Sequence, residues 1–222
     1  MPGDDVSSKI FGEIYKSEHW EGGSGQGSRA NATEAYRWVL ETVLGARDVR
    51  TVVDAGCGDW EFAQLIDWSP VSYVGVDVVP DVIEHNTATF GRPNVSFECT
   101  DMSRSVLPQA DVLLCKDVLQ HWPIEWIADF LLRVRGRYRY VLLTNDITSV
   151  RCPPEHLNSQ IPVGAWRTLD LERAEFGQSA AWRLDYDVGG EWTKRILLLV
   201  KRRYRLRARA TPNSALRRLR SL

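Results

Sequence analysis

The segment Thr51–Asp59 constrains this chain most, because it reads Thr-Val-Val-Asp-Ala-Gly-Cys-Gly-Asp. A short β-branched run is typical of a buried strand, and the Gly-x-Gly that follows it is typical of a tight turn. A second apolar run, residues 73–76, ends in Asp77. A glycine turn after one strand and an acid at the end of the next are typical of doubly wound α/β sheets that bind a nucleoside-containing cofactor.

From residue 50 onward, strand-like and helix-like segments alternate. Strands are expected over residues 50–54, 72–77, 94–98, 110–115, 138–144, 181–187 and 193–200. Helices are expected over residues 6–20, 30–44, 60–67, 80–89 and 123–134, and a long loop over 145–168. This alternation predicts an α/β fold with a doubly wound, mostly parallel seven-stranded sheet. The last two strands flank Gly189-Gly190 and are expected to form a C-terminal antiparallel hairpin.

The length of 222 residues and a hydrophobic content of 44% suit one α/β domain. We expect residues 31–200 to form it, after an N-terminal helix and a Gly/Ser-rich segment in residues 1–30. No stretch reaches the roughly 20 apolar residues of a membrane span, and the N-terminus is acidic rather than a basic-then-apolar signal. The four cysteines lie far apart without metal-ligand spacing, so we expect reduced thiols, no metal and a cytoplasmic protein.

Residues 201–222 form a basic tail with 9 of the 28 basic residues and no acid. Residues 1–200 therefore carry 19 basic against 29 acidic residues. A basic tail suggests contact with nucleic acid or a membrane surface. We favour a solvated tail instead, because an acidic body is a poor platform for a phosphate backbone.

The charge around the first glycine turn selects between cofactors. A dinucleotide-binding turn needs a third glycine where this chain has Glu61. Asp54 and Asp59 flank the turn without a basic residue, and two carboxylates repel a pyrophosphate. They suit a cationic ligand without phosphate, which favours S-adenosylmethionine.

Four segments in succession resemble the four motifs of the class I S-adenosylmethionine-dependent methyltransferases, whose fold is Rossmann-like. They are residues 53–58, 76–78, 99–102 and 111–121, and the resemblance extends over roughly residues 34–200. It implies a transferase that uses S-adenosyl-L-methionine. The cofactor-binding residues that it implies are Asp54, Gly56, Cys57, Gly58, Asp77, Val78, Asp101, Met102 and Lys116.

The resemblance also implies individual roles in this set. The first motif would hold the methionine end of the cofactor, and its glycines allow close backbone approach. Asp77 would accept the ribose hydroxyls and Asp101 the adenine amine, with Val78 and Met102 on either side of the ring.

The candidate general bases cluster after the fourth motif's strand. Asp117 and His121 are four residues apart and share one face of a helical turn. His121 suits proton transfer near neutrality, although a histidine here also closes the cofactor pocket in relatives. The arrangement resembles that of phosphoethanolamine methyltransferases, where the histidine works with a tyrosine, and Tyr15 is the candidate partner. Asp146, at the end of the fifth expected strand, is a further base, a substrate ligand or a divalent-metal ligand.

Two segments outside the four motifs are expected to enclose the substrate. The Gly/Ser run 22–28 is interpreted as a lid, with Trp20 covering the cofactor, against the alternative of a plain linker. On the loop 145–168, Trp166 is a candidate to stack on a sugar or aromatic ring. The loop's polar candidates for gripping the substrate are Arg151, His156, Asn158 and Arg167.

We interpret the chain as an enzyme that methylates a small molecule, with O-methylation of a sugar or natural-product hydroxyl favoured. N-methylation of a small amine, RNA or protein methylation with the basic tail, and nucleotide-dependent oxidoreduction are the alternatives. No nucleic-acid partner is expected, because residues 116–119 lack the Asn-Pro-Pro-aromatic signature of base-modifying relatives. A homodimer is compatible with the sequence, which does not fix the oligomeric state.

Overall fold

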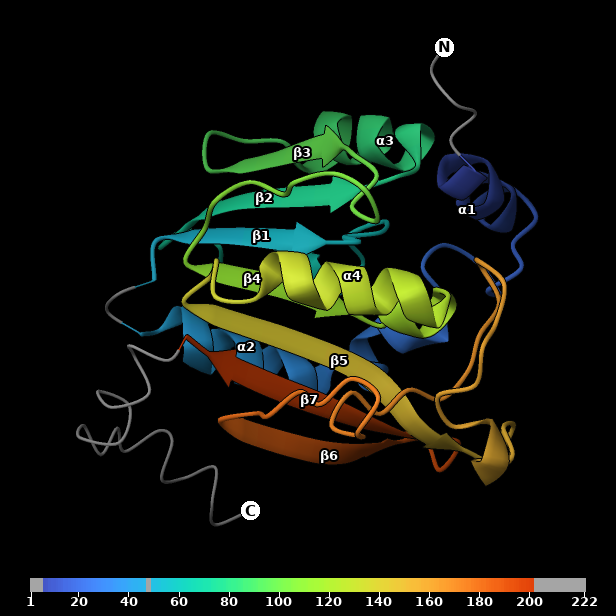
Figure 1. Cartoon of the computed structure of the whole chain (residues 1–222). Helices are drawn as coiled ribbons and strands as arrows, with labels where there is room; N and C mark the ends of the chain where they lie inside the picture. Colours follow the sequence, from blue (N-terminus) through green and yellow to red (C-terminus); the bar gives the residue numbers. More distant parts are fainter. Residues whose placement is uncertain (1–5, 47–48, 202–222) are drawn as a thin grey trace.

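A computed structural model describes residues 6–46 and 49–201. Seven strands form one sheet in the order β3-β2-β1-β4-β5-β7-β6 (Figure 1). The strands are β1 Thr51–Ala55, β2 Ser72–Asp77, β3 Val95–Cys99, β4 Val112–Lys116, β5 Tyr140–Ser149, β6 Trp182–Val188 and β7 Trp192–Val200. The first five pair in parallel, whereas β7 is antiparallel to both β5 and β6. The expected fold class is therefore confirmed.

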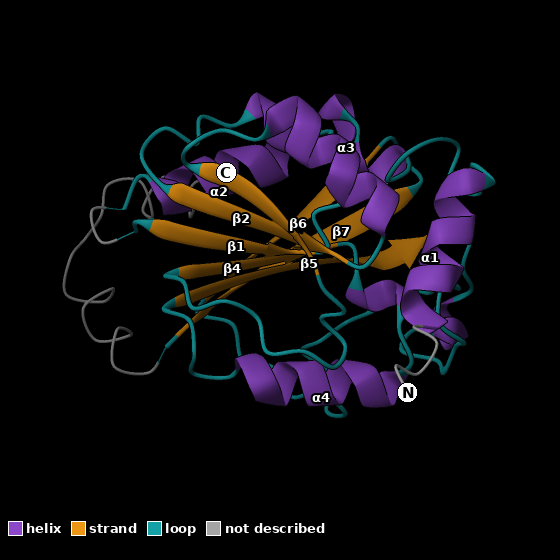
Figure 2. Ribbon diagram, turned by 90° about the horizontal axis from the view of Figure 1, so that it is seen from above, coloured by secondary structure: helices purple, strands orange, loops and turns teal. Residues whose placement is uncertain are grey.

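Helices cover both faces of the sheet (Figure 2). They are α1 Val6–Lys16, α2 Glu34–Leu44, α3 Pro80–Phe90 and α4 Ile124–Val134. In Figure 2, α2 and α3 lie on one side of the strands and α4 on the other, while α1 lies beyond the carboxyl ends of the parallel strands. No helix of the described residues is long and apolar enough to cross a membrane.

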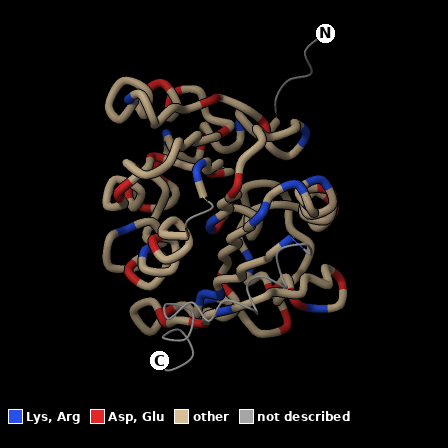
Figure 3. Tube along the Cα trace, turned by 90° about the vertical axis from the view of Figure 1, so that its left-hand side faces the viewer, with Lys and Arg blue, Asp and Glu red and all other residues tan. Residues whose placement is uncertain are grey.

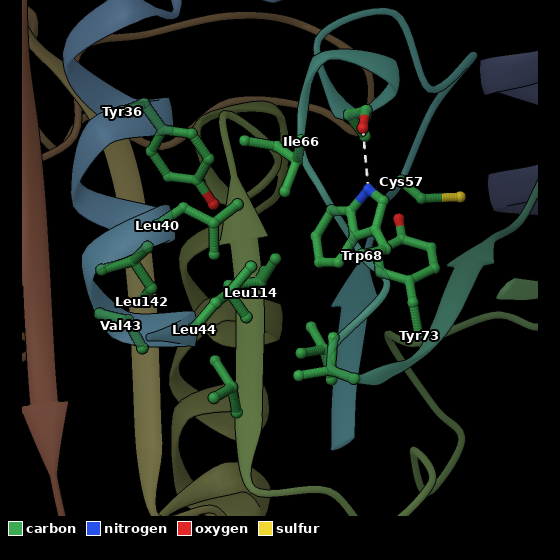
Figure 4. Packing of buried hydrophobic residues seen from close by; sticks show 14 of the residues in the cluster. Tyr36, Leu40, Val43, Leu44, Cys57, Ile66, Trp68, Tyr73, Leu114 and Leu142 are labelled. Carbon is green, nitrogen blue, oxygen red and sulfur yellow. Dashed lines mark hydrogen bonds between the residues drawn. The ribbon is translucent and has the colours of Figure 1, made fainter. Parts of the chain in front are cut away.

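Alternation along the strands sends apolar side chains to both faces. On β4, Val112 and Leu114 join the core under α2 and α3, whereas Leu113 and Cys115 join the core under α4. Figure 4 shows the first core, where side chains of α2 point toward the sheet and Trp68 donates its indole N–H to the carbonyl of the 63–65 turn (2.8 Å). Rigid packing of both faces fixes the strand ends, where the site forms.

Four expected boundaries are wrong. The helix expected over 30–44 begins at Glu34, after a separate 3-10 turn at Ala30–Ala32. The helix expected over 60–67 is a short 3-10 turn at Ala63–Leu65, because Trp60 adopts a left-handed backbone conformation (φ 63°) and Ile66 is already extended. The helix expected over 6–20 ends at Lys16. β5 continues to Ser149, through the first residues of the expected loop, because β7 pairs with it along that length.

Basic and acidic positions are interspersed along the chain trace (Figure 3). The basic tail, apart from Lys201, lies outside the described residues.

Candidate active site

A cavity of about 340 Å³ lies at the carboxyl ends of the parallel strands. The turns after β1, β2, β3 and β4 line it, together with α1 and residues 17–28, which we call the lid segment. This is the edge at which doubly wound sheets bind ligands. The cavity lining includes nearly all the expected site residues: Tyr15, Trp20, Gly56, Cys57, Gly58, Asp77, Val78, Asp101, Met102, Lys116, Asp117, His121 and Asp146.

Asp77 connects the first two of these turns. Its carboxylate accepts the backbone N–H groups of Gly58 (3.0 Å) and Val79 (3.1 Å). Gly58 has φ 56°, and a Cβ there would lie 2.1 Å from Ser24 Oγ of the lid segment. A side chain at Gly58 would therefore separate the lid segment from the turn. Burial raises the pKa of Asp77 because it disfavours the charged carboxylate, so this position suits a ligand that donates hydrogen bonds to it.

Asp54 is the one expected cofactor residue outside the described lining. Its side chain is 2% exposed and accepts a hydrogen bond from the Tyr73 hydroxyl (2.8 Å) behind the glycine turn. Burial raises the pKa of Asp54 to about 6, although the Tyr73 hydrogen bond acts in the opposite direction. Tyr73 of β2 thus fixes the Asp54 side chain at the end of β1, and contact of Asp54 with the cofactor stays a prediction.

Replacing Tyr73 by phenylalanine is expected to lower the free energy of unfolding by about 2 kcal/mol at pH 8, because a buried carboxylate loses its donor. The folded-state pKa of Asp54 lies above its ordinary value, so Asp54 favours folding in acid and this contribution is lost as the pH rises through about 6. The difference in free energy of unfolding between the native protein and the Tyr73→Phe variant should therefore be smaller at pH 5 than at pH 8. Urea unfolding at both pH values measures it.

Tyr36→Phe is the matched control, because the Tyr36 hydroxyl is equally buried and has no hydrogen-bond partner among the described residues. It should leave the unfolding free energy unchanged or raise it. If both variants lost the same free energy of unfolding, the hydrogen bond from Tyr73 to Asp54 would not have the stabilising role given to it.

The third motif lies at the far end of the cavity. Met102 is 4% exposed, and Asp101 accepts the backbone N–H of Ser103 (2.9 Å). Ser7 of α1 reaches the other oxygen of Asp101 at a long 3.5 Å. Asp101 and Met102 thus lie where the lining meets the N-terminal helix.

His121 is held as a neutral imidazole. Its Nδ1 lies 3.0 Å from the carbonyl oxygen of Ala165, which requires the proton to be on Nδ1. Burial lowers the pKa of His121 to about 4. Nε2 has no hydrogen-bond partner among the described residues and is unprotonated at neutral pH, although the lowered pKa makes it a weaker base than an ordinary histidine.

Four charged side chains of alternating sign form a chain along one side of the cavity. Lys116 Nζ lies 2.6 Å from Asp117 Oδ2, which also lies 2.9 Å from Lys194 Nζ; Lys194 Nζ then lies 2.6 Å from Asp146 Oδ1. We call these four residues the charge chain. They carry a net charge of zero, and the two lysines hold the pKa of Asp117 below its usual range despite burial.

The charge chain changes the roles of the two acidic base candidates. Asp117 contacts two buried ammonium groups that lower its pKa, so it is a poor proton acceptor. Asp146 contacts the buried ammonium group of Lys194. Asp146 also accepts hydrogen bonds from Gln120 and Trp166. With its oxygens thus engaged, nothing about its position favours a metal ligand, and the described residues contain no cluster of three or more potential metal-binding side chains.

The lid segment is fastened to the glycine turn through Ser24. Ser24 N donates to Asp59 Oδ2 and Ser24 Oγ accepts from Asp59 N, each at 2.9 Å. The Tyr15 hydroxyl also lies 2.9 Å from Ser24 Oγ. At the other end, Lys116 Nζ donates to the carbonyl of Gly27 (2.8 Å). Lys116 therefore holds the lid segment as well as lining the cavity.

The expected Tyr15–His121 pair is not formed. Trp20 lies between the two, with ring centroids 5.8 Å from Tyr15 and 5.0 Å from His121. The Tyr15 hydroxyl is directed to Ser24 instead. Trp20 lines the cavity, and its covering of the cofactor stays a prediction.

Of the four polar loop candidates, Arg151 lines the cavity. Arg167 is 1% exposed, and its guanidinium donates to the Trp122 carbonyl (2.8 Å). Asn158 bonds the backbone of Asp170, and His156 is exposed. Arg167, Asn158 and His156 do not contribute to the cavity lining.

A family model described as an O-methyltransferase domain matches residues 5–151. The chain therefore belongs to this family of methyltransferases, and the class predicted from the motifs is confirmed. No curated protein sequence matches the chain.

Solved structures agree on the fold. The N-methyltransferase NodS from Bradyrhizobium japonicum, in complex with S-adenosyl-L-homocysteine, matches 90% of this chain and all of its own, with TM-score 0.63 and 12% identity. The magnesium protoporphyrin IX methyltransferase from Synechocystis, with the same ligand, matches 87% of this chain and 99% of its own (TM-score 0.62, 14% identity). The mitomycin 7-O-methyltransferase matches 75% of this chain and 55% of its own (TM-score 0.51, 18% identity).

Proposed function

We propose that this enzyme transfers a methyl group from S-adenosylmethionine to a hydroxyl of a small molecule, with His121 as the general base. The cofactor supplies an electrophilic methyl group on a sulfonium. The protein must then position the acceptor and remove its proton. The observation that carries the proposal is the hydrogen bond from His121 Nδ1 to Ala165, which leaves Nε2 as a base in the cavity.

The residues of the cavity fit this cofactor. Asp77 and Asp101 give the lining two acids. The two lysines of the lining are paired with aspartates in the charge chain, and Arg151 is paired with Glu191, so none of these three cations is left to neutralise a pyrophosphate. Arg104 lies 3.7 Å from Asp101 but is largely exposed. Carboxylates of this kind favour hydroxyl, amine and sulfonium groups over phosphate. The solved relatives that bind S-adenosylhomocysteine support the same assignment.

The acceptor side of the cavity is aromatic. Trp166 and Trp192 both contribute to the lining, and the indole N–H of Trp166 donates to Asp146 (3.1 Å). Flat walls of this kind suit a sugar or aromatic ring. With a charge chain of zero net charge beside them, they favour a neutral hydroxylated ring.

Two measurements test the proposal. S-adenosylhomocysteine should raise the melting temperature of the protein, whereas NADH should not. Methyl transfer from labelled S-adenosylmethionine should then be found within a panel of sugars, phenols and amines. Stabilisation by NADH alone would contradict the methyltransferase assignment, and transfer only to amines would replace the hydroxyl acceptor by the alternative of N-methylation.

We further propose that the lid segment opens for cofactor exchange, with Ser24 as its fastening. Ser24→Ala removes the hydrogen bonds that Ser24 Oγ makes with Asp59 and Tyr15. The dissociation of S-adenosylhomocysteine is expected to become faster by about tenfold, which corresponds to roughly 1.4 kcal/mol. Stopped-flow tryptophan fluorescence measures this rate.

Ser17→Ala is the control, because Ser17 lies in the same segment and its hydroxyl reaches only the Ile14 carbonyl. It should leave the dissociation rate unchanged. Equal rates for the Ser24 and Ser17 variants would show that Ser24 does not fasten the lid segment.

A further inference from the structure

Lys194 is a buried cation that the sequence motifs do not include. It lies on β7 directly opposite Asp146 of β5 in the antiparallel ladder, and it is 2% exposed. Its Nζ contacts Asp146 Oδ1 (2.6 Å) and Asp117 Oδ2 (2.9 Å). These two carboxylates raise the pKa of Lys194 despite its burial, so it remains an ammonium group.

The second oxygen of Asp146 faces the wall of the cavity. Asp146 Oδ2 accepts Gln120 Nε2 (3.0 Å) and Trp166 Nε1 (3.1 Å). The backbone N–H of Asp146 donates to Gln120 Oε1 (2.8 Å), so both polar atoms of the Gln120 side chain are fixed. Gln120 directly precedes His121. Asp146 therefore orients one aromatic wall and the residue beside the proposed base.

The two carboxylates depend on Lys194 to different extents. Asp117 also pairs with Lys116, whereas Lys194 is the one cation in contact with Asp146 among the described residues. Removing the cation of a buried ion pair destabilises a protein far more than removing the cation of a surface pair, because the carboxylate is left buried and uncompensated. Removing Lys194 should therefore displace Asp146 and the groups that it holds.

We propose that Lys194 is a positioning residue, which fixes the acceptor-side wall of the cavity through Asp146 and Trp166. The inference rests on the proposed function in one respect, namely that the acceptor binds beside Trp166. Asp77 and Asp101 lie outside the charge chain, and Lys116, which holds Gly27 of the lid segment, keeps its partner Asp117 without Lys194. We therefore expect the cofactor end of the cavity to depend less on Lys194 than the acceptor side.

The indole signal of Trp166 provides a test that needs no acceptor. In ¹H–¹⁵N spectra, the chain's nine tryptophans give separate indole N–H signals, and Trp166→Phe identifies one of them. Lys194→Met is expected to shift the Trp166 signal away from its native position, because Asp146 no longer fixes the indole. A folded Lys194→Met protein with this signal unmoved would overturn the proposal.

Arg183→Met is the matched control, since it removes an exposed cation from the neighbouring strand β6. It should leave the Trp166 signal in place. If Lys194→Met does not fold, the double variant Asp117→Asn/Lys194→Met serves instead, because its charge chain keeps a net charge of zero. The double variant should show the same shift, and an unmoved signal in it would again overturn the proposal.

Kinetics supply the second arm. Lys194→Met should raise KM for the acceptor by about tenfold, whereas the affinity for S-adenosylhomocysteine should change by less than about threefold. Equal losses of both affinities would overturn a role confined to the acceptor side. If the native enzyme methylates no acceptor in the panel, the proposed function fails, and the indole signal still decides the role of Lys194.

Discussion

His121→Ala is expected to lower kcat for methyl transfer by about 10² to 10⁴, the range typical for the loss of a positioned general base. The neutral imidazole presents Nε2 in the cavity because Nδ1 is held by the Ala165 carbonyl. The affinity for S-adenosylhomocysteine should change by no more than about threefold, or roughly 0.6 kcal/mol. Added imidazole should restore part of the activity. Steady-state kinetics and calorimetric binding measure the two effects.

The pH dependence follows from the lowered pKa of His121. A general base acts in its deprotonated form, so activity is lost as the pH falls through about 4, and no inflection in kcat/KM is expected near the ordinary histidine value of 6.5. The free energy of unfolding should also decrease as the pH falls. Below the ordinary histidine pKa, the unfolded chain takes up a proton on His121, whereas the folded protein does not. Folding should therefore weaken as the pH falls from 6.5 toward 4.

His156→Ala is the control for these experiments. His156 is exposed on the loop that follows β5 and does not contribute to the cavity lining. It should retain the native rate. A His121→Ala enzyme with native kcat would show that the histidine only closes the cavity, which is the structural alternative considered for it.

Asp77→Asn is expected to weaken the binding of S-adenosylhomocysteine by about a hundredfold, or roughly 2.7 kcal/mol. The substitution keeps the shape of the side chain but removes the charged acceptor proposed to receive the ribose hydroxyls. In asparagine, one of the two oxygens that accept the Gly58 and Val79 N–H groups becomes an NH2 group, which cannot accept a hydrogen bond. The melting temperature without ligand should therefore fall, and stabilisation by the ligand should be lost.

Asp81→Asn is the matched control, an exposed acid in the first turn of α3. It should bind the ligand with native affinity. If Asp77→Asn bound equally well, the second motif would have been assigned the wrong role.

The strands could be predicted from the sequence because their apolar runs are short, β-branched and bounded by turn residues. The segment 60–67 could not, since its apolar residues have helical spacing but serve to bury Trp60 and Trp68 on the same core. Periodicity alone does not distinguish a helix from an irregular segment in which each apolar side chain finds its own packing site. The extension of β5 depends on pairing with β7, a contact between distant parts of the chain.

The site was predictable to the extent that it follows strand ends. Lys194 was missed because it lies within a strand assigned to the hairpin, far from every motif. A signal was nevertheless present: the two-residue period of the strand places Lys194 on the same face as Ile196 and Leu198, which are buried. A cation on an inward face needs a carboxylate partner. Ser24 gave no such signal, since its partner Asp59 becomes its neighbour only in the folded chain.

The position of α1 has a consequence for how the molecule is made. The first helix of the chain packs against the loop near Gly164, where an added Cβ would lie 2.7 Å from Ile10 and 3.1 Å from Ile14. A ribosome delivers Gly164 long after α1 has emerged, so this contact cannot form until five of the seven strands have been synthesised. The part of the cavity wall where α1 meets this loop is therefore completed late in synthesis.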